Sequence, residues 1–183
     1  MGIKILPGTT IELHGSILSV RAISSSLFLA DGLTLAQVSS LTNLSPAVLQ
    51  SWVRRGFLPP PLKKRYSEAQ FFRIAIINIL KDDLQLGLIV KLINYVNMPV
   101  EGAGAAVTDD TALYHYFVEA LFLADRNIDK LDAAIETALR SFREPYPGAR
   151  KRIAAVIRIM IILYISSQIK ESAGVLLRNI GLK

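Results

Sequence analysis

The stretch that decides the fold is residues 33–67, which read LTLAQVSSLTNLSPAVLQSWVRRGFLPPPLKKRYS. It opens with Thr34, a favourable N-cap, and apolar residues then recur at every third position, which predicts a short helix over 35–41. Asn43 follows, and asparagine is among the few residues other than glycine that tolerate the left-handed backbone of a tight turn. The first part of this stretch therefore predicts a helix and a turn.

A second helix is predicted after the turn. Ser45 is a favourable N-cap, and Pro46 suits the first helical position, where no hydrogen bond is lost. Gly56 ends the helix. Its apolar face includes Val48, Leu49, Trp52 and Val53. Its opposite face includes Ala47, Gln50, Ser51, Arg54 and Arg55.

The segment after the second helix predicts a wing. Three consecutive prolines at 59–61 cannot be helical, because proline lacks an N–H donor and pushes the preceding residue toward extended geometry. A tight basic tip at 63–65 follows them. Ser67, with a glutamine three residues later, then forms a capping box for a helix over about 68–82, and a further helix is predicted over 84–96.

Charge is distributed unevenly along the chain. The formal net charge is +6, but residues 32–67 contain five basic residues and no acidic one. Residues 82–136 contain ten acidic residues and three basic ones. A localised basic cluster is typical of a surface that binds a polyanion. Because this cluster coincides with two short helices and a basic tip, the favoured polyanion is double-stranded DNA.

The order of these segments resembles the DNA-binding domain of the MerR family. The matching pieces are the first helix, the turn LTNLS at 41–45, the aromatic Trp52, the piece GFLPP at 56–60 and the wing end KRYS at 64–67. The resemblance covers residues 33–97 and implies an all-α fold with a winged helix-turn-helix in a transcriptional regulator. The chain as a whole is similar to bacterial proteins of unknown function that have such a domain before a helical C-terminal region.

Several positions differ from the usual MerR pattern. Asn43 stands where that family usually has glycine, and Gln50 and Ser51 stand where it commonly has an Arg-Tyr pair that contacts DNA. The wing is also several residues shorter. These differences leave an alternative open, namely a protein-interaction module whose helix-turn-helix has lost DNA binding.

The candidate DNA contacts follow from how a helix enters the major groove. Its N-terminal and outward side chains meet base edges, whereas cations meet phosphates and supply affinity without sequence information. The candidate base contacts are Ser45, Ala47, Gln50 and Ser51, of which glutamine can bind adenine through two hydrogen bonds. The candidate phosphate contacts are Arg54, Arg55, Lys63, Lys64 and Arg65. Trp52 is expected in the core.

The rest of the chain divides into three parts. Residues 1–31 form an N-terminal segment that can pack on the C-terminal helices, with a weak strand over 9–13 and a helix over 16–29. The winged helix-turn-helix takes 32–97, and 98–108, rich in glycine and alanine, form a linker. Residues 109–183 form a helical region that dimerises, senses an unidentified effector, or both. In that region Asp109 or Asp110 caps one helix, Asn127 starts a second, and a third runs from about 149 to 169.

The last predicted helix is apolar nearly all round, which is typical of a helix packed on several sides. Residues 153–169 are barely long enough to span a bilayer, and Arg158 near their centre would be costly there. We therefore expect no membrane partner, and we expect Arg158 to reach the surface or to pair with an acidic residue. More apolar side chains point outward than two neighbouring helices can cover, which predicts a homodimer held by the C-terminal region.

The composition argues against an enzyme. The chain has no cysteine, which excludes disulfides and thiolate chemistry and fits a reducing cytoplasm. Its two histidines, His14 and His115, are about a hundred residues apart, and we find no phosphate-binding glycine loop or nucleophile elbow. We therefore expect a cytoplasmic, non-enzymatic protein with no metal and no cofactor.

Overall fold

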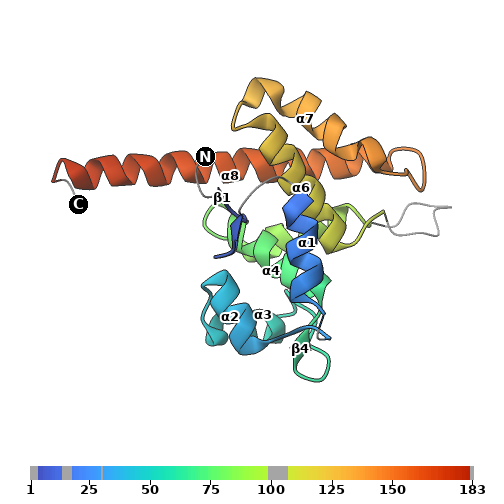
Figure 1. The fold of residues 1–183 in the computed structure, drawn as a ribbon, viewed down its shortest axis with the longest axis vertical. Coiled ribbons are helices and arrows are strands. Elements are labelled where there is room, and N and C mark those ends of the chain that lie inside the picture. The colour runs from blue at the N-terminus through green and yellow to red at the C-terminus, as the bar shows by residue number, and fades with distance from the viewer. Residues whose placement is uncertain (1–3, 14–17, 30, 99–106, 182–183) are drawn as a thin grey trace.

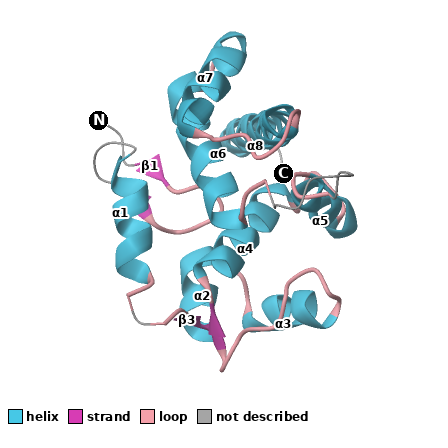
Figure 2. Cartoon of the chain, turned by 90° about the vertical axis from the view of Figure 1, so that its right-hand side faces the viewer, coloured by secondary structure: helices cyan, strands magenta, loops and turns pink. Residues whose placement is uncertain are grey.

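The computed structural model describes residues 4–13, 18–29, 31–98 and 107–181, and within them the chain is mostly helical (Figures 1 and 2). The α-helices are α1 (Leu18–Leu27), α2 (Leu35–Thr42), α3 (Pro46–Arg54), α4 (Glu68–Leu80), α5 (Leu86–Tyr95), α6 (Asp110–Ala124), α7 (Leu131–Ala138) and α8 (Ala149–Asn179). The strands are β1 (Lys4–Ile5), β2 (Glu12–Leu13), β3 (Leu33–Thr34) and β4 (Arg65–Tyr66). The predicted all-α class is confirmed.

The helix starts lie where the capping residues predict them. Thr34 caps α2 and Ser67 caps α4, each in a capping box with the glutamine three residues later. Ser45 caps α3, with Pro46 in its first turn. Asp109 caps α6 by accepting from the amide of Ala112 at 2.7 Å. Each cap supplies an acceptor to a backbone N–H that has no partner inside the helix.

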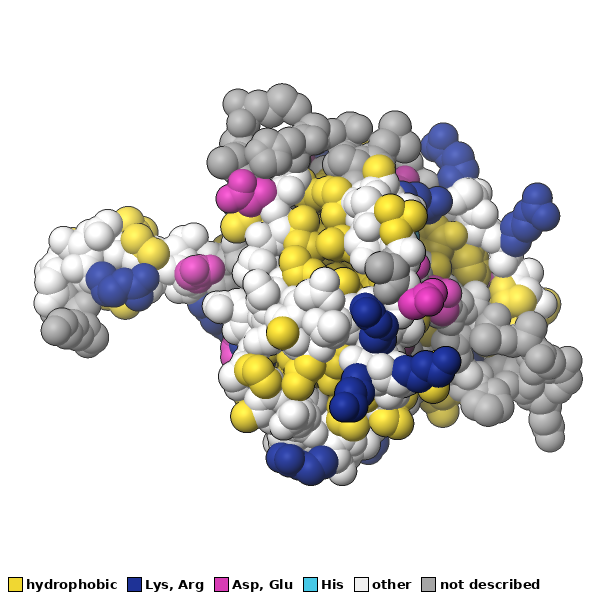
Figure 3. Space-filling model, turned by 60° about the horizontal axis from the view of Figure 1, so that its bottom comes forward, with side chains coloured by type: hydrophobic (Ala, Val, Ile, Leu, Met, Phe, Trp, Pro, Cys, Tyr) yellow, Lys and Arg dark blue, Asp and Glu magenta, His cyan; other side chains and the backbone are white. Residues whose placement is uncertain are grey.

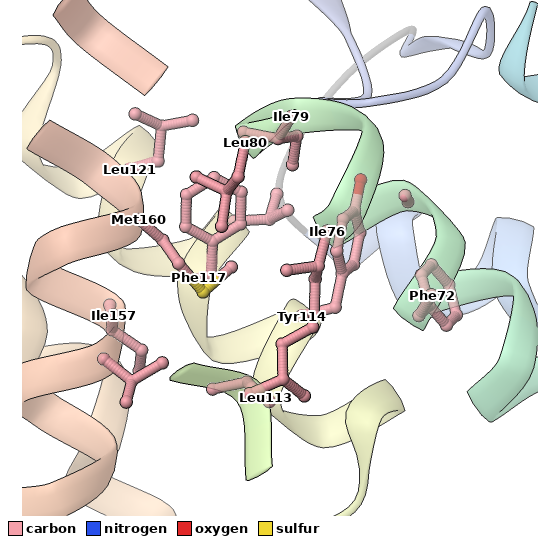
Figure 4. Packing of buried hydrophobic residues seen from close by; sticks show 14 of the residues in the cluster. Phe72, Ile76, Ile79, Leu80, Leu113, Tyr114, Phe117, Leu121, Ile157 and Met160 are labelled. Atoms are coloured by element: carbon pink, nitrogen blue, oxygen red, sulfur yellow. The ribbon is translucent and has the colours of Figure 1, made fainter. Parts of the chain in front are cut away.

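Helix α4 is the centre of the core. Its buried side chains are Phe71, Phe72, Ile74, Ala75, Ile76, Ile77, Ile79 and Leu80, so the helix is covered on almost every side. Figure 4 shows how α4 meets α6 and α8 through Ile76, Tyr114, Phe117 and Met160. The Phe72 and Tyr114 rings stack with their centroids 4.6 Å apart. One contiguous apolar cluster therefore joins the first half of the chain to the second.

The N-terminal segment is attached to this core by hydrogen bonds. The hydroxyl of Tyr114 donates to the carbonyl of Pro7 at 2.5 Å, and the amide of Asn78 donates to the carbonyls of Gly8 and Thr42. The predicted strand over 9–13 is wrong in its first half. Only Glu12 and Leu13 pair, antiparallel with β1, because Gly8 turns the chain with φ of 73° just before Thr9.

The predicted linker lies mostly outside the described residues, since 99–106 are among those the structure does not describe. Its two ends lie close together. The side-chain oxygen of Asn97 accepts from the amides of Val107 and Thr108 at 2.8 and 3.1 Å. Helix α5 and the start of α6 are therefore linked directly by one side chain.

The C-terminal region differs from the expectation in two ways. The helix expected after Asn127 is interrupted, with 3-10 turns at Ile128–Lys130 and Leu139–Ser141 on either side of α7. Helix α8 does not end near residue 169 but continues to Asn179. The sequence offers neither a proline nor a capping turn at 169, so nothing there stops a helix.

Arg158 pairs with Asp132 of α7 at 2.5 Å, which confirms that this arginine takes an acidic partner from the acidic middle of the chain. Among the described helices, α8 alone is long and apolar enough to cross a membrane by length and composition, and a third of its most apolar stretch is buried in the protein. Helices α4, α5, α6 and α7 all pack against it.

We predict that Gly8→Ala destabilises the protein far more than Gly148→Ala. Both glycines have a left-handed backbone, with φ of 73° and 94°, so alanine is strained at both. A Cβ at Gly8 would also lie 2.3 Å from the carbonyl oxygen of Ala75, whereas a Cβ at Gly148 meets nothing within 4 Å. The expected losses in the free energy of unfolding are about 2–5 and about 1–2 kcal/mol. Urea unfolding measures both, and equal losses would show that the N-terminal turn does not press on α4.

Candidate nucleic-acid interface

Two short helices, α2 and α3, are held at a fixed angle by the turn between them. Asn43 has a left-handed backbone with φ of 55°, as its position predicts. The hydroxyl of Ser39 donates to the carbonyl of Leu44 at 2.6 Å and closes the turn from the side of α2. Leu49 and Trp52 of α3 are buried, so the inner face of α3 is fixed to the core and its outer face is presented to solvent.

The outer face of α3 contains most of the predicted base contacts. Ser45, Ala47 and Gln50 are exposed, and Ser51 is half-buried. Val48, which the apolar pattern places in the core, is 37% exposed. At the start of a helix that packs through its later turns, the first apolar residue extends past the edge of the contact.

A two-residue hairpin follows the proline run. Leu62 and Arg65 face each other, and the amide of Arg65 donates to the carbonyl of Leu62 at 2.8 Å. The two residues between them, Lys63 and Lys64, both have left-handed backbones, with φ of 46° and 64°. A turn of this kind favours Asn-Gly, because left-handed geometry is strained for other residues. Two lysines at such a tip suggest that the charges have a use that offsets the strain.

The hairpin is fixed to the rest of the interface at its base. Strand β4 pairs with β3, Leu33 opposite Tyr66 and Thr34 opposite Arg65. The Tyr66 side chain is buried, as expected for a residue under the wing, and burial raises its pKa. The side-chain amide of Gln70 donates to the carbonyls of Pro59 and Pro60 at 3.0 Å. The capping box of α4 therefore also anchors the proline run.

The structure brings three of the predicted contacts to one place. Gln50 and Arg54 of α3 and Lys64 of the hairpin border the same hollow, of about 490 Å³. Leu35, Val53, Pro61 and Tyr66 complete its lining. The outer face of α3 and the tip of the hairpin are thus adjacent parts of one surface.

Two predicted phosphate contacts differ from the rest. The guanidinium of Arg55 lies over the ring of Phe57, 4.6 Å from its centroid, and borders a separate hollow together with Val48 and Asp82. Arg65 is exposed, but one of its nitrogens donates to the carbonyl of Gly32 at 2.9 Å. The i to i+1 step along α3 explains the separation of Arg54 from Arg55, because neighbouring helical residues point about 100° apart.

The charged side chains of this surface are all positive. Residues 32–67 contain no acidic side chain, and Arg54, Lys63 and Lys64 have no ion-pair partner among the described residues. Figure 3 turns this end of the molecule toward the viewer and shows several Lys and Arg side chains over it. Such a surface attracts anions over distances of about 10 Å at moderate salt.

The two aspartates at the start of α6 have structural roles. Asp110 pairs with Arg73 of α4 at 2.7 Å, and Asp109 is the cap described above. Burial, aided by Arg21, lowers the pKa of His115, and the ring meets Phe72 edge-on. His14 lies outside the described residues. Within the described part of the chain, no group of three or more His, Asp or Glu side chains could hold a metal ion.

Comparisons with known proteins give one match. A protein-family model described as a domain of unknown function (DUF1836) matches residues 16–117. Searches of the curated proteins and of the solved structures find no match to the chain. The matched residues include the whole surface formed by α2, α3 and the hairpin, together with α4, α5 and the first half of α6.

We predict that Lys64→Gly stabilises the protein. Glycine adopts the left-handed backbone of the hairpin without strain, so the free energy of unfolding is expected to rise by about 0.5–1 kcal/mol. Lys91→Gly is the matched control, because Lys91 is exposed on α5 and glycine inside a helix is expected to lower that free energy by about 1 kcal/mol. Urea unfolding measures both. A loss of stability in Lys64→Gly would mean that the hairpin is not strained at this residue.

Proposed function

Because the chain belongs to the DUF1836 family, whose function is unknown, we propose from the geometry that it is a DNA-binding transcriptional regulator. The observation that supports this most directly is the shared position of Gln50, Arg54 and Lys64 on one acid-free surface. A polar residue on an outward helix face beside flanking cations is the arrangement that a major-groove helix requires.

The proposal assigns a role to each part of the surface. Helix α3 enters the major groove with Gln50 toward base edges, and Ser45 and Ala47 lie nearest the bases at its N-terminal end. Arg54, Arg55 and the hairpin lysines contact phosphates on either side of the groove. In this arrangement α2, α3 and the hairpin form a MerR-like winged helix-turn-helix, and the short turn at Lys63 and Lys64 is a small wing.

The proposed regulator acts in the cytoplasm as a homodimer. One copy offers a single short helix and a small wing, which bury little surface on DNA. Proteins of this type reach useful specificity by contacting two half-sites about one helical turn apart. The proposal assigns no catalytic step, metal or cofactor to the chain.

The alternative is a protein-interaction module that no longer binds DNA. Its support is the exposed Val48 beside a hollow of about 810 Å³ that Trp52, Phe57 and Leu84 also line. Charged residues, Arg55, Lys81 and Asp82, also border this hollow, and an apolar floor with a charged rim suits the surface of a protein partner. The two functions differ in what they require of Arg54 and Lys64, which border the other hollow.

We predict that the protein binds double-stranded DNA with a strong dependence on salt. If Arg54, Arg55, Lys63 and Lys64 neutralise about four phosphates per copy, log K falls against log salt with a slope of about −3.6 for each copy bound. Filter binding to random genomic fragments at several salt concentrations measures the slope. Affinity that does not change with salt, or no binding at low salt, would favour the interaction module.

We predict that substitutions on the surface separate affinity from specificity. Arg54→Ala and Lys64→Ala are expected to weaken binding to all sequences about equally, each lowering the steepness of the salt slope by about 1. Gln50→Ala is expected to change the preferred sequence instead. Arg143→Ala removes an exposed arginine from the loop before α8, far from this surface, and serves as the control (Figure 1).

Selection of bound sequences from a random pool compares the preferences of these variants. An unchanged preference in Gln50→Ala would mean that α3 does not face the bases. Equal losses of affinity in Arg54→Ala and Arg143→Ala would mean that the surface described above is not where DNA binds.

A further inference from the structure

The second half of α8 extends beyond the body of the protein (Figures 1 and 3). We call residues 166–180 the arm; Ser166, Ser167 and Gln168 are half-buried and Lys170 pairs with Asp83 at 2.6 Å, and the arm is largely exposed beyond them. Its large apolar side chains are open to solvent, with exposed fractions of 63% for Ile169, 66% for Leu176 and 70% for Ile180. An isolated stretch of helix this apolar is unfavourable in water, because each exposed side chain of this kind gains free energy when it is buried.

Although Val175 and Leu177 are exposed elsewhere on α8, most of its exposed apolar residues follow a regular spacing. Counting back from the arm, they alternate in steps of four and three residues, which is the a and d pattern of a coiled-coil seam. We call this set the seam: Ala155, Ile159, Ile162, Ser166, Ile169, Ala173, Leu176 and Ile180. No charged residue belongs to it, and Ala155, Ile159, Ile162 and all its members from Ile169 onward are exposed.

The seam lies on the side of α8 that faces away from the core. Nine residues make two and a half helical turns, so residues nine apart point in opposite directions. Ile153, Ile157 and Met160 are buried in the core, and the residues nine positions later are Ile162, Ser166 and Ile169. In Figure 2, which looks nearly along α8, α6 and α7 lie to one side of it and α5 lies below.

A shallow apolar groove continues the seam over the body. Ile159 and Ile162 of α8 border it together with Leu163, and the facing residues are Leu84, Leu88 and Leu92 in and before α5. Its volume is about 340 Å³. The groove therefore widens the apolar surface of the seam at Ile159 and Ile162.

We propose that two copies of the chain associate through α8 in antiparallel orientation, with the arm of each copy lying along the seam and groove of the other. The two-fold axis passes between Ser167 and Gln168. This inference rests on the proposed function, because a dimer is what would contact two half-sites on DNA. The interface itself is formed by α8 and α5 alone.

The sizes of the seam residues are complementary in this register. Ile162 meets the partner subunit's Ala173, and Ser166 meets the partner subunit's Ile169. Ala155 meets the partner subunit's Ile180. Each of these layers pairs a large side chain with a small one, and only Ile159 with the partner subunit's Leu176 joins two large ones. Alternation of large and small residues is what lets facing helices interdigitate.

Charge favours the antiparallel orientation over the parallel one. The first turn of α8 contains Arg150, Lys151 and Arg152, and Lys151 is exposed. In the antiparallel arrangement these three cations lie beside the C-terminal end of the partner's α8, whose last carbonyls hold partial negative charge and whose last turn contains one cation, Arg178. A parallel pair would bring the two basic turns together, which is unfavourable.

The length of the contact fits a stable dimer. The seam extends over residues 155–180, which is about 38 Å of helix at 1.5 Å per residue. A stable interface buries about 800 Å² on each partner, and a seam of this length with the α5 groove beside it offers an extended apolar surface of that kind. A second copy of the chain therefore covers both the arm and the groove at once.

The first test measures the mass of the full-length protein by light scattering at micromolar concentration, without DNA. The wild type is expected to give the mass of a dimer, and Ile169→Asp and Leu176→Asp half that mass. Val175→Asp is the matched control, since Val175 is on the arm and 42% exposed but lies outside the seam. It is expected to remain a dimer. A monomeric wild type, or a dimeric Ile169→Asp, would overturn the proposal.

The second test determines the relative orientation of the two α8 helices. The chain has no cysteine, so only the introduced cysteines can form a crosslink. The double variant Ile162→Cys with Ala173→Cys is expected to form a covalent dimer on oxidation. Within one chain the two sites are about 16 Å apart along the helix, too far for a disulfide. Each single variant is expected to stay uncrosslinked, because its cysteine faces the other position in the partner subunit. Efficient crosslinking of both single variants would indicate a parallel pair and overturn the proposal.

The outcomes separate this inference from the proposed function. A dimer that fails to bind DNA at low salt leaves the interface intact and removes the regulator. A monomer that binds DNA overturns the proposed interface but supports the proposed regulator. Sedimentation of the wild type as a monomer with anionic lipid vesicles would mean that the seam faces a bilayer, and this result also overturns the proposal.

Discussion

The structure depends on the burial of one helix that has no polar face. Helix α4 has eight buried side chains in thirteen residues, so it cannot lie on a surface and must be surrounded. Helices α2, α6 and α8 and the N-terminal turn each cover part of it, and the ion pair of Arg73 with Asp110 is formed where α4 meets α6. Burial of this much apolar surface is the largest favourable contribution to folding. The polar surface of α3 and the hairpin is held in place because α4 fixes the elements beneath it.

Local sequence signals determine the structure of the candidate interface more than they determine that of the core. Capping residues place the starts of α2, α3 and α4, and a left-handed Asn43 sets the angle between the first two. The hairpin breaks a local rule, since two lysines occupy positions where glycine and asparagine are favoured. Departures of this kind tend to occur where a side chain is needed for binding. The same region thus combines a predictable scaffold with an unfavourable, charged tip.

The sequence predicts the fold well wherever a short-range signal decides it. Thr34, Ser45, Ser67 and Asp109 all cap the helices they were expected to cap, because a cap depends on residues three positions away. Long-range packing cannot be predicted from the sequence in the same way. No residue near Gly8 indicates that its backbone lies against Ala75. The helical pattern separates Arg54 from Arg55, but it does not show that the Arg55 guanidinium lies over the Phe57 ring. The predicted end of α8 near residue 169 is wrong for a related reason. The nearly continuous apolar run ends at Ile169, whereas the helix continues to Asn179 with apolar residues at wider spacing.

The hydrogen bond from Tyr114 to the carbonyl of Pro7 joins residues 107 positions apart, and it has a consequence for the order of events during synthesis. The N-terminal turn can bond to Asn78 once α4 has been made, but the bond from Tyr114 forms only after the first turns of α6 have left the ribosome. Until then the side of α4 that α6 covers is exposed. Native contacts of such long sequence separation slow folding and lengthen the time that apolar surface is open. The nascent chain is therefore most in need of a chaperone midway through translation, after α4 has emerged and before α6 is complete.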